Sequence, residues 1–253
     1  MSNMTTRLQD QKVIQAALSK FENDRRATIP TEIFDIVSEG KIYAKDHPLR
    51  SGKIELRYMT AYDEDILTSA TYLKEGVTLD KLLEALIITP VNLNEIGTID
   101  KNGLILAARI MSYGKHYPIM VTDPGTGKMI ERSVDLSTIR ATNLNLTPDD
   151  NGEFDYVLED GTRLKFTLNI NESLTGDSVS KRLSQLIKQV DDNRNSTDIL
   201  DFIKYKFLAS ESKKFQKYVV ENTPVLDLTY EFEGEDGSAF NVGFQLGSNL
   251  FWF

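Results

Sequence analysis

The chain contains no cysteine and only two histidines among its 253 residues. Without cysteine it can form neither a disulfide bond nor a thiolate metal site such as a zinc ribbon, and it has no cysteine nucleophile. Two histidines are also too few for a metal centre built from several imidazole ligands. From these absences we expect no metal site and no cofactor.

Positive charge is scarce as well, because 29 lysine and arginine residues stand against 38 aspartate and glutamate residues, a net charge of −9. This balance disfavours nucleic acid and anionic membranes, so we expect neither as a partner. No apolar run approaches the roughly 18 residues of a membrane-spanning helix, and Asp10 and Lys12 make the start of the chain too polar for a secretion signal. A composition of 40% hydrophobic and 26% charged residues indicates a soluble, folded, cytoplasmic protein.

Apolar residues recur with a helical period in seven segments. They predict helices over Leu8–Phe21, Ala61–Ser69, Thr78–Ile87, Ile99–Tyr113, Val179–Val190, Thr197–Ser210 and Glu211–Val220. Thr60 and Asp63 form an acidic variant of the capping box before the second of these helices. Gly114 is expected to end the fourth helix in the left-handed conformation.

Alternating apolar and polar residues predict a strand at Ile54–Tyr58 and three β-hairpins. The hairpins pair Tyr117–Val121 with Met129–Leu136, Phe154–Leu158 with Arg163–Leu168, and Leu226–Phe232 with Phe240–Leu246. Hairpins mixed with helices, without a regular βαβ alternation, indicate an α+β fold that lacks a parallel doubly wound sheet. We expect an N-terminal helical arm over residues 1–29, one domain over 30–146, and a C-terminal α+β region over 147–253.

Three features resemble known sites only superficially. Asp123–Lys128 resembles the end of a phosphate-binding loop, but it lacks the early glycine and the final hydroxyl, and a strand follows it, so a hairpin turn is favoured. Thr147–Leu158 lacks the acidic residue that closes a calcium loop and reads as a solvated loop. His47 and His116 have no nucleophile at a catalytic spacing, and we expect capping or surface roles for them.

Two further clusters are more informative. Asp63, Glu64 and Asp65 are consecutive, so their side chains diverge on a helix, and the helix dipole explains acids in a first turn better than paired-carboxylate catalysis does. The chain ends in Leu250-Phe251-Trp252-Phe253. Apolar residues at a terminus need packing, so they either close the core or dock on another subunit.

The residues between Ser38 and Leu144 carry a resemblance to a known family. Six strings follow one another there: SEGKIY (38–43), HPL (47–49), SGKIELRYMT (51–60), DEDILTS (63–69), LKEGVTLDKLLE (73–84) and AARIMSYG (107–114). Together they resemble the baseplate hub proteins of T-even-like contractile-tailed bacteriophages. On this resemblance, residues 30–146 are the hub-family domain.

The resemblance implies a non-enzymatic tail morphogenesis protein, either a subunit of the baseplate hub or an assembly factor (chaperone) for it. Its partners would be other baseplate and tail proteins, with self-association left open. The protein would lie in the host cytoplasm during assembly and, for a lasting subunit, in the virion. The residues expected to serve interaction or fold identity are Arg57, Asp63, Glu64, Asp65, Arg109, Tyr113, Phe251, Trp252 and Phe253. An ion pair between Arg57 or Arg109 and the acidic run Asp63–Asp65 is our hypothesis for part of this set.

Two other function classes remain as alternatives. The first is a cell-wall hydrolase of the tail hub, which would need two carboxylates roughly 5 to 9.5 Å apart in a cleft. The second is a nucleotide-binding regulator, which would be stabilised by ATP and magnesium.

Overall fold

The computed structural model of the protein describes residues 29–170 and 178–252. The helix expected at Leu8–Phe21 lies outside the described residues, together with Phe253 and nearly all of the predicted arm 1–29. The described α-helices are α2 (Ala61–Thr68), α3 (Ala70–Glu75), α4 (Thr78–Leu86), α5 (Thr98–Tyr113), α6 (Val179–Leu186), α7 (Ser196–Tyr205) and α8 (Ala209–Asn222). The strands are β1 (Thr31–Asp35), β2 (Lys53–Arg57), β3 (His116–Thr122), β4 (Met129–Asp135), β5 (Glu153–Val157), β6 (Arg163–Thr167), β7 (Ile187–Val190), β8 (Thr229–Glu233) and β9 (Ala239–Gly243).

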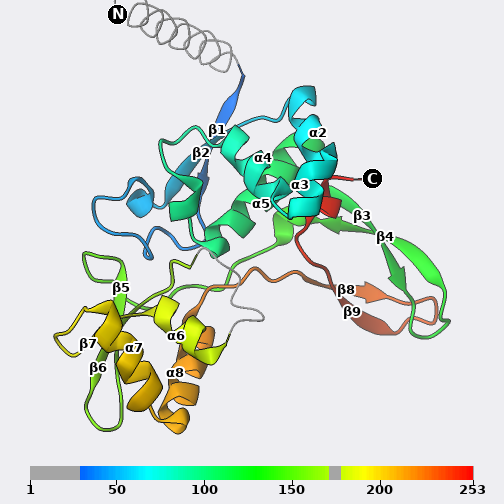
Figure 1. The fold of residues 1–253 in the computed structure, drawn as a ribbon. Helices are drawn as coiled ribbons and strands as arrows, with labels where there is room; N and C mark the ends of the chain where they lie inside the picture. The colour runs from blue at the N-terminus through cyan, green and yellow to red at the C-terminus, as the bar shows by residue number, and fades with distance from the viewer. Residues whose placement is uncertain (1–28, 171–177, 253) are drawn as a thin grey trace, which may run out of the picture.

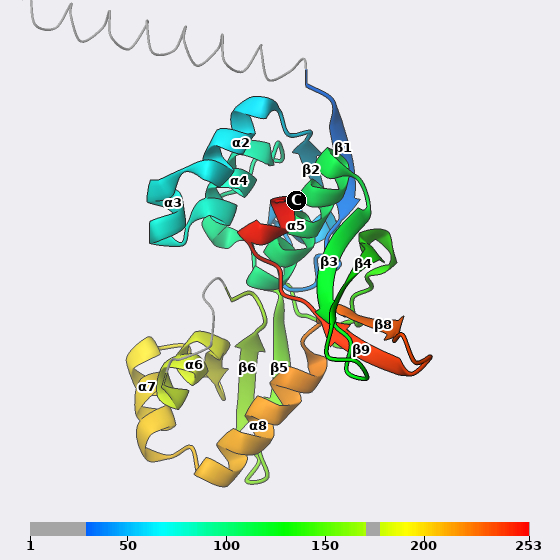
Figure 2. The same ribbon diagram turned by 90° about the vertical axis from the view of Figure 1, so that its right-hand side faces the viewer.

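These elements gather in three groups, which Figures 1 and 2 show from two sides. The first group holds β1, β2 and α2 to α5, and the second holds β5 to β7 with α6 to α8. The third consists of two hairpins, β3–β4 and β8–β9, which project away from the helices. All strand pairs in the described part of the chain are antiparallel, in one sheet of three strands and three of two. The predicted α+β class is confirmed.

The three expected hairpins are present, with strands close to the predicted bounds. In the first, β3 pairs with β4 from His116↔Asp135 to Thr122↔Met129. The connecting residues 123–128 are therefore a hairpin turn, as the sequence favours, and a strand rather than a helix follows them. The hairpins β5–β6 and β8–β9 pair in the same antiparallel manner.

The prediction of one helix over Val179–Val190 is wrong in its last turn. The helix α6 ends at Leu186, and the next four residues form β7, which pairs with β6. Ile187 is buried in this pairing. A residue pattern reports local periodicity only, whereas the free edge of β6 offers main-chain hydrogen bonds that outweigh the helical preference.

The helix predicted over Thr197–Ser210 is also too long, because α7 ends at Tyr205 and α8 begins at Ala209. The link turns back so that the ring of Phe207 stacks on Phe202, with ring centroids 5.2 Å apart. Gly114 follows α5 with φ 81° and ψ 173°, which is not the left-handed helical conformation that we expected. Its positive φ still favours glycine.

The buried apolar residues form one continuous cluster that runs through the first two groups. The groups are also joined by main-chain hydrogen bonds, from Lys45 to the carbonyl of Asp150 and from Thr98 to the carbonyl of Ile170, each over 2.8 Å. Gly152, with φ 75°, lies so close to Tyr43 that a Cβ atom would meet its carbonyl at 2.6 Å. The loop 147–152 is therefore packed against the first group, and glycine is required at this contact.

Candidate functional site

Arg57 and Asp63 lie where β2 ends and α2 begins. They form a bidentate ion pair in which Nη1 donates to Oδ2 and Nη2 donates to Oδ1, each over 2.7 Å. Both side chains are buried, with 5% of Arg57 and 2% of Asp63 exposed. The hypothesis of an ion pair between Arg57 and the acidic run is confirmed, and Asp63 is the partner.

Further hydrogen bonds surround this pair. Oδ2 of Asp63 also accepts from the backbone N–H of Thr60 at 2.8 Å and from its hydroxyl at 2.9 Å, as the acidic capping box predicts. Arg57 donates through Nε to the carbonyl of Ala85 at 2.9 Å and through Nη1 to that of Tyr58 at 3.0 Å. Because Ala85 lies in α4, the pair ties together β2, α2 and α4.

The surroundings of Asp63 favour its charged form. Burial alone would raise the pKa of this carboxyl. The hydrogen bonds from Arg57 and Thr60, together with the Arg57 charge, lower the pKa by more than burial raises it. The resulting pKa lies below its ordinary value. The pair is therefore ionised at neutral pH, and each charge is paired and hydrogen-bonded, as a buried charge must be.

Glu64 and Asp65, the other two members of the acidic run, lie on the exposed side of α2. Glu64 reaches α5, where its Oε1 accepts a hydrogen bond from the Tyr113 hydroxyl at 2.8 Å. Partial burial, together with the hydrogen bond to Glu64 and its charge, raises the pKa of Tyr113 to about 12. Tyr113 is thus a neutral donor at neutral pH that fastens α2 to α5, whereas Asp65 remains at the surface.

Arg109 is fully buried in α5 and donates to backbone carbonyls. Its Nε donates to Leu250 at 2.7 Å, its Nη1 to Gly114 at 2.9 Å and its Nη2 to His116 at 3.4 Å. The guanidinium also lies 5.2 Å from the ring centroid of Tyr113. Arg109 therefore links the end of α5 and the start of β3 to a segment 141 residues further along the chain.

The C-terminal aromatic residues divide between the core and the surface. Leu250 and Phe251 are buried, and the Phe251 ring meets the edge of Tyr113 with centroids 6.3 Å apart. Trp252 is 43% exposed. Of the two roles left open for this terminus, core closure holds for Phe251, while Trp252 presents its ring to solvent. Glu64, Arg109, Tyr113 and Phe251 thus form one cluster around α5, separate from the Arg57–Asp63 pair.

Asp100 is a further buried carboxylate that the sequence analysis did not single out. Its oxygens accept from the Tyr43 hydroxyl at 2.6 Å and from the Ser38 backbone N–H and hydroxyl at 2.7 Å each. Burial raises the pKa of Asp100 in spite of these hydrogen bonds. This network fixes the start of α5 against residues 38–43, so its role is structural.

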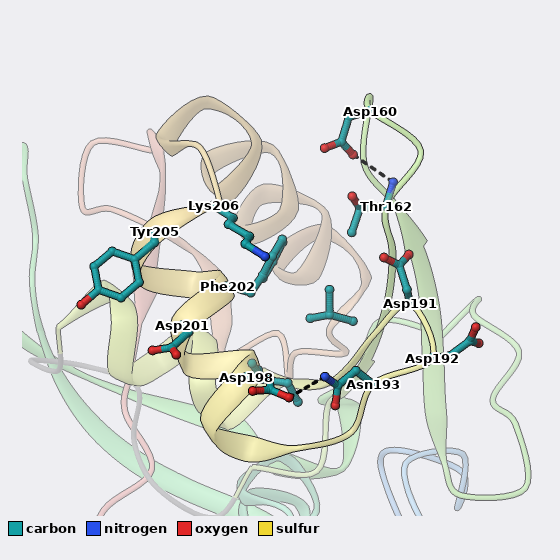
Figure 3. Close-up of a pocket in the computed structure, with 12 residues that line it drawn as sticks. Asp160, Thr162, Asp191, Asp192, Asn193, Asp198, Asp201, Phe202, Tyr205 and Lys206 are labelled. Atoms are coloured by element: carbon teal, nitrogen blue, oxygen red, sulfur yellow. Dashed lines mark hydrogen bonds between the residues drawn. The ribbon is translucent and has the colours of Figure 1, made fainter.

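A pocket of about 1010 Å³ lies in the second group between α7 and the loops that follow β5 and β7 (Figure 3). Five aspartates line it, accompanied by one lysine and by Phe202 and Tyr205. The aspartates are Asp160, Asp191, Asp192, Asp198 and Asp201. This pocket could not be predicted from the sequence, because its residues are up to 46 positions apart and the segment before Asp191 is predicted to be helical.

Several of these carboxylates hold the local backbone. Asp160 accepts from the backbone N–H of Thr162 and Asp191 from that of Arg163, each at 2.9 Å. Asp198 accepts from the side-chain Nδ2 of Asn193 at 2.7 Å. The hydrogen bond from Thr162 lowers the pKa of Asp160, whereas a general acid needs a raised pKa. Residues 29–170 and 178–252 contain no group of three or more acidic or histidine side chains placed to hold a metal ion.

The other residues that the sequence suggested have local roles. Nδ1 of His47 accepts from the backbone N–H of Leu49 at 3.2 Å, so His47 caps a short 3₁₀ turn, and His116 is exposed at the start of β3. In the loop 147–152, Asp149 pairs with Lys165 over 2.8 Å. The capping and surface roles predicted for the histidines are confirmed. None of the helices in the described ranges is long and apolar enough to cross a membrane.

Comparison with known proteins relates the chain to a phage protein family. The model of a family described as T4 bacteriophage base plate protein matches residues 41–244. Neither the curated proteins nor the solved structures contain a match to the chain. The matched range includes Arg57, Asp63, Arg109 and Tyr113, and it ends before the buried Phe251.

Proposed function

The chain belongs to the T4 bacteriophage base plate protein family, and we propose that it acts at the hub of the tail baseplate, as a subunit or as an assembly factor. It acts through protein–protein contacts with other baseplate and tail proteins and not as an enzyme. The observation that carries this proposal is the family match across 41–244, which spans all three groups of elements. The six strings between residues 38 and 114 support the hub as the place of action.

The surface supports a role in binding proteins. Several large apolar or aromatic side chains are more than two thirds exposed: Tyr62 and Tyr205 at 79%, Val220 at 71% and Leu208 at 68%. Aromatic side chains supply much of the binding energy at protein interfaces. The net charge of −9 disfavours binding to nucleic acid, which is also negatively charged, and so favours proteins as partners.

The charged residues support a non-enzymatic role. Arg57 and Asp63 bond to each other inside the core, and Arg109 donates to backbone carbonyls there. In the large pocket, the hydrogen bond from Thr162 lowers the pKa of Asp160, which is the direction that hinders acid catalysis.

Mass spectrometry of purified phage particles, combined with deletion of the gene, tests the proposal. In both roles, cells infected with the deletion phage fail to form complete baseplates. A lasting subunit is also found in purified wild-type particles, whereas an assembly factor is absent from them. Complete and functional baseplates in the deletion phage would contradict both roles.

A further inference from the structure

The two projecting hairpins each leave a main-chain edge without a partner strand. Among the strands of the described residues, β3 pairs only with β4, and β9 pairs only with β8. The hairpins lie side by side (Figures 1 and 2), and Asp123 in the first turn accepts a hydrogen bond from the backbone of Glu235 in the second at 2.7 Å. The Tyr117 and Phe244 rings also face one another across the two hairpins, 6.2 Å apart. The two hairpins therefore contact each other and form one unit.

The register shows which main-chain groups point outward. Asp123 donates to Lys128 and Leu136 donates to Lys115, so the odd-numbered residues of β3 form the hydrogen-bonded pairs with β4. Because hydrogen-bonded and non-hydrogen-bonded pairs alternate in an antiparallel sheet, Met120 and Thr122 direct their N–H and C=O groups away from β4. In the second hairpin Gly234 donates to Ser238. By the same alternation, Asn241 and Gly243 direct their N–H and C=O groups away from β8.

The opposite side of the same unit is capped by side chains. Arg132 donates to the outward carbonyl of Glu233 at 3.0 Å and to that of Glu131 at 3.1 Å. The Tyr230 hydroxyl donates to the outward carbonyl of Asp135 at 2.9 Å. In the described part of the chain no side chain donates in this way to Met120, Thr122, Asn241 or Gly243. On the other side, the first outward positions of β3 are also closed, because Arg109 donates to the carbonyl of His116 and Pro118 has no N–H. The open part of this edge is therefore the stretch of Met120 and Thr122.

A groove of about 430 Å³ runs along the open side, between β3 and the segment 242–249. Its twelve lining residues include no charged side chain. A bound segment must therefore place uncharged side chains into the groove, because a charged side chain would find no charged partner there. Met120, which lines the groove, is 56% exposed, and methionine is common at surfaces that adapt to partner side chains.

We propose that the open edge of β3 is a strand-addition site for an extended segment of another baseplate or tail protein. The segment pairs its main chain with Met120 and Thr122 and places uncharged, mainly apolar side chains at every second position into the groove. In this mode of recognition the main-chain hydrogen bonds supply affinity, and the pockets for alternate side chains supply specificity. That the partner is a baseplate or tail protein rests on the proposed function. That the edge of β3 is open rests on the structure alone.

Proline substitutions test the proposal because they remove single outward N–H groups and leave the hairpin ladder intact. Met120→Pro removes an N–H from the open edge. Ser133→Pro is the matched control, since Ser133 is exposed and directs its N–H outward from β4, on the capped side. Thr122→Pro is a second variant of the open edge. Circular dichroism and thermal unfolding select the variants that fold as the wild type does.

The probe is an array of short overlapping peptides covering the other baseplate and tail proteins of the same phage, applied to the full-length chain. We expect peptides with alternating apolar residues to bind. Met120→Pro or Thr122→Pro should weaken this binding about tenfold, because a main-chain hydrogen bond is lost and the proline ring clashes with the peptide. Ser133→Pro should leave the binding unchanged. Binding of no peptide, or equal binding by all variants, overturns the proposal. If the wild type self-associates and Met120→Pro abolishes this, the edge binds a second copy of the chain. The proposal that a different protein binds there would then be overturned.

Complementation separates this proposal from the proposed function. A deletion phage that builds complete baseplates without the chain contradicts the proposed function. If the deletion phage fails, and Met120→Pro restores baseplates as well as Ser133→Pro does, only the strand-addition proposal is overturned. Restoration by Ser133→Pro together with failure by Met120→Pro is the expected result.

Discussion

Asp63→Asn is the sharpest test of how the first group of elements is held together. The substitution keeps the size of the side chain and removes its charge, which leaves the Arg57 guanidinium buried beside a neutral partner with only 5% of its side chain exposed. Removing one partner of a buried ion pair costs about 3–5 kcal/mol of unfolding free energy. The exposed pair of Lys53 and Asp35, with 60% and 83% of their side chains exposed, provides the matched control. Asp35→Asn should cost less than about 1 kcal/mol.

The same substitution has a defined pH dependence. The pKa of Asp63 is lowered in the folded chain, so below neutral pH the unfolded state binds more protons than the folded state does. The stabilisation from this carboxylate is therefore complete above its unfolded pKa of about 3.9, and it is lost as the pH falls through the folded pKa. The difference in unfolding free energy between the wild type and Asp63→Asn should be largest near neutral pH and should shrink below about pH 4.

Urea unfolding followed by circular dichroism measures these free energies for the wild type and both variants. The double variant Arg57→Met/Asp63→Asn removes the unpaired charge and should recover part of the loss. If Asp63→Asn costs no more than Asp35→Asn, or if its cost does not change between neutral and acidic pH, the buried pair does not hold β2, α2 and α4 together and the reasoning fails.

Three further predictions concern α5 and the surface around it, and each is measured by urea unfolding. Arg109→Lys should cost about 2–4 kcal/mol, because a single ammonium nitrogen cannot occupy the three separate nitrogen positions from which the guanidinium reaches its carbonyls, and an unchanged stability would show that these hydrogen bonds are dispensable. Phe251→Ala should cost about 3–5 kcal/mol through the cavity it leaves, whereas Trp252→Ala should cost less than about 1 kcal/mol; equal losses would contradict the division of the terminus between core and surface. Asp65→Lys should change stability by no more than about 0.5 kcal/mol, and a loss comparable to that of Asp63→Asn would mean that Asp65 has a structural partner.

Most elements of the fold follow from local sequence patterns, because their determinants lie close together in the chain. The capping box of Thr60 and Asp63 spans three residues, and each hairpin is joined by a short polar turn. The turn from α6 to β7 could not be predicted, since it depends on the open edge of β6, which lies more than twenty residues earlier in the chain. Local periodicity carries no information about such an edge.

The candidate residues divide in the same way. The pair of Arg57 and Asp63 could be inferred because a short strand end and a helix start bring oppositely charged residues together. The contact of Arg109 with the carbonyl of Leu250 could not be inferred. The acceptor is a backbone group 141 residues away, and every residue type has such a carbonyl. The acidic pocket and the open edge of β3 are equally invisible, since both arise from the packing of loops and hairpins that are distant in sequence.

The central claim is that this family member builds the baseplate through contacts with other proteins. Electron microscopy of cells infected with a phage that lacks the gene tests it most directly, with complete baseplates counted against the wild type. The account predicts that complete baseplates are missing and that the wild-type chain supplied in trans restores them. Normal numbers of complete baseplates without the chain would contradict it.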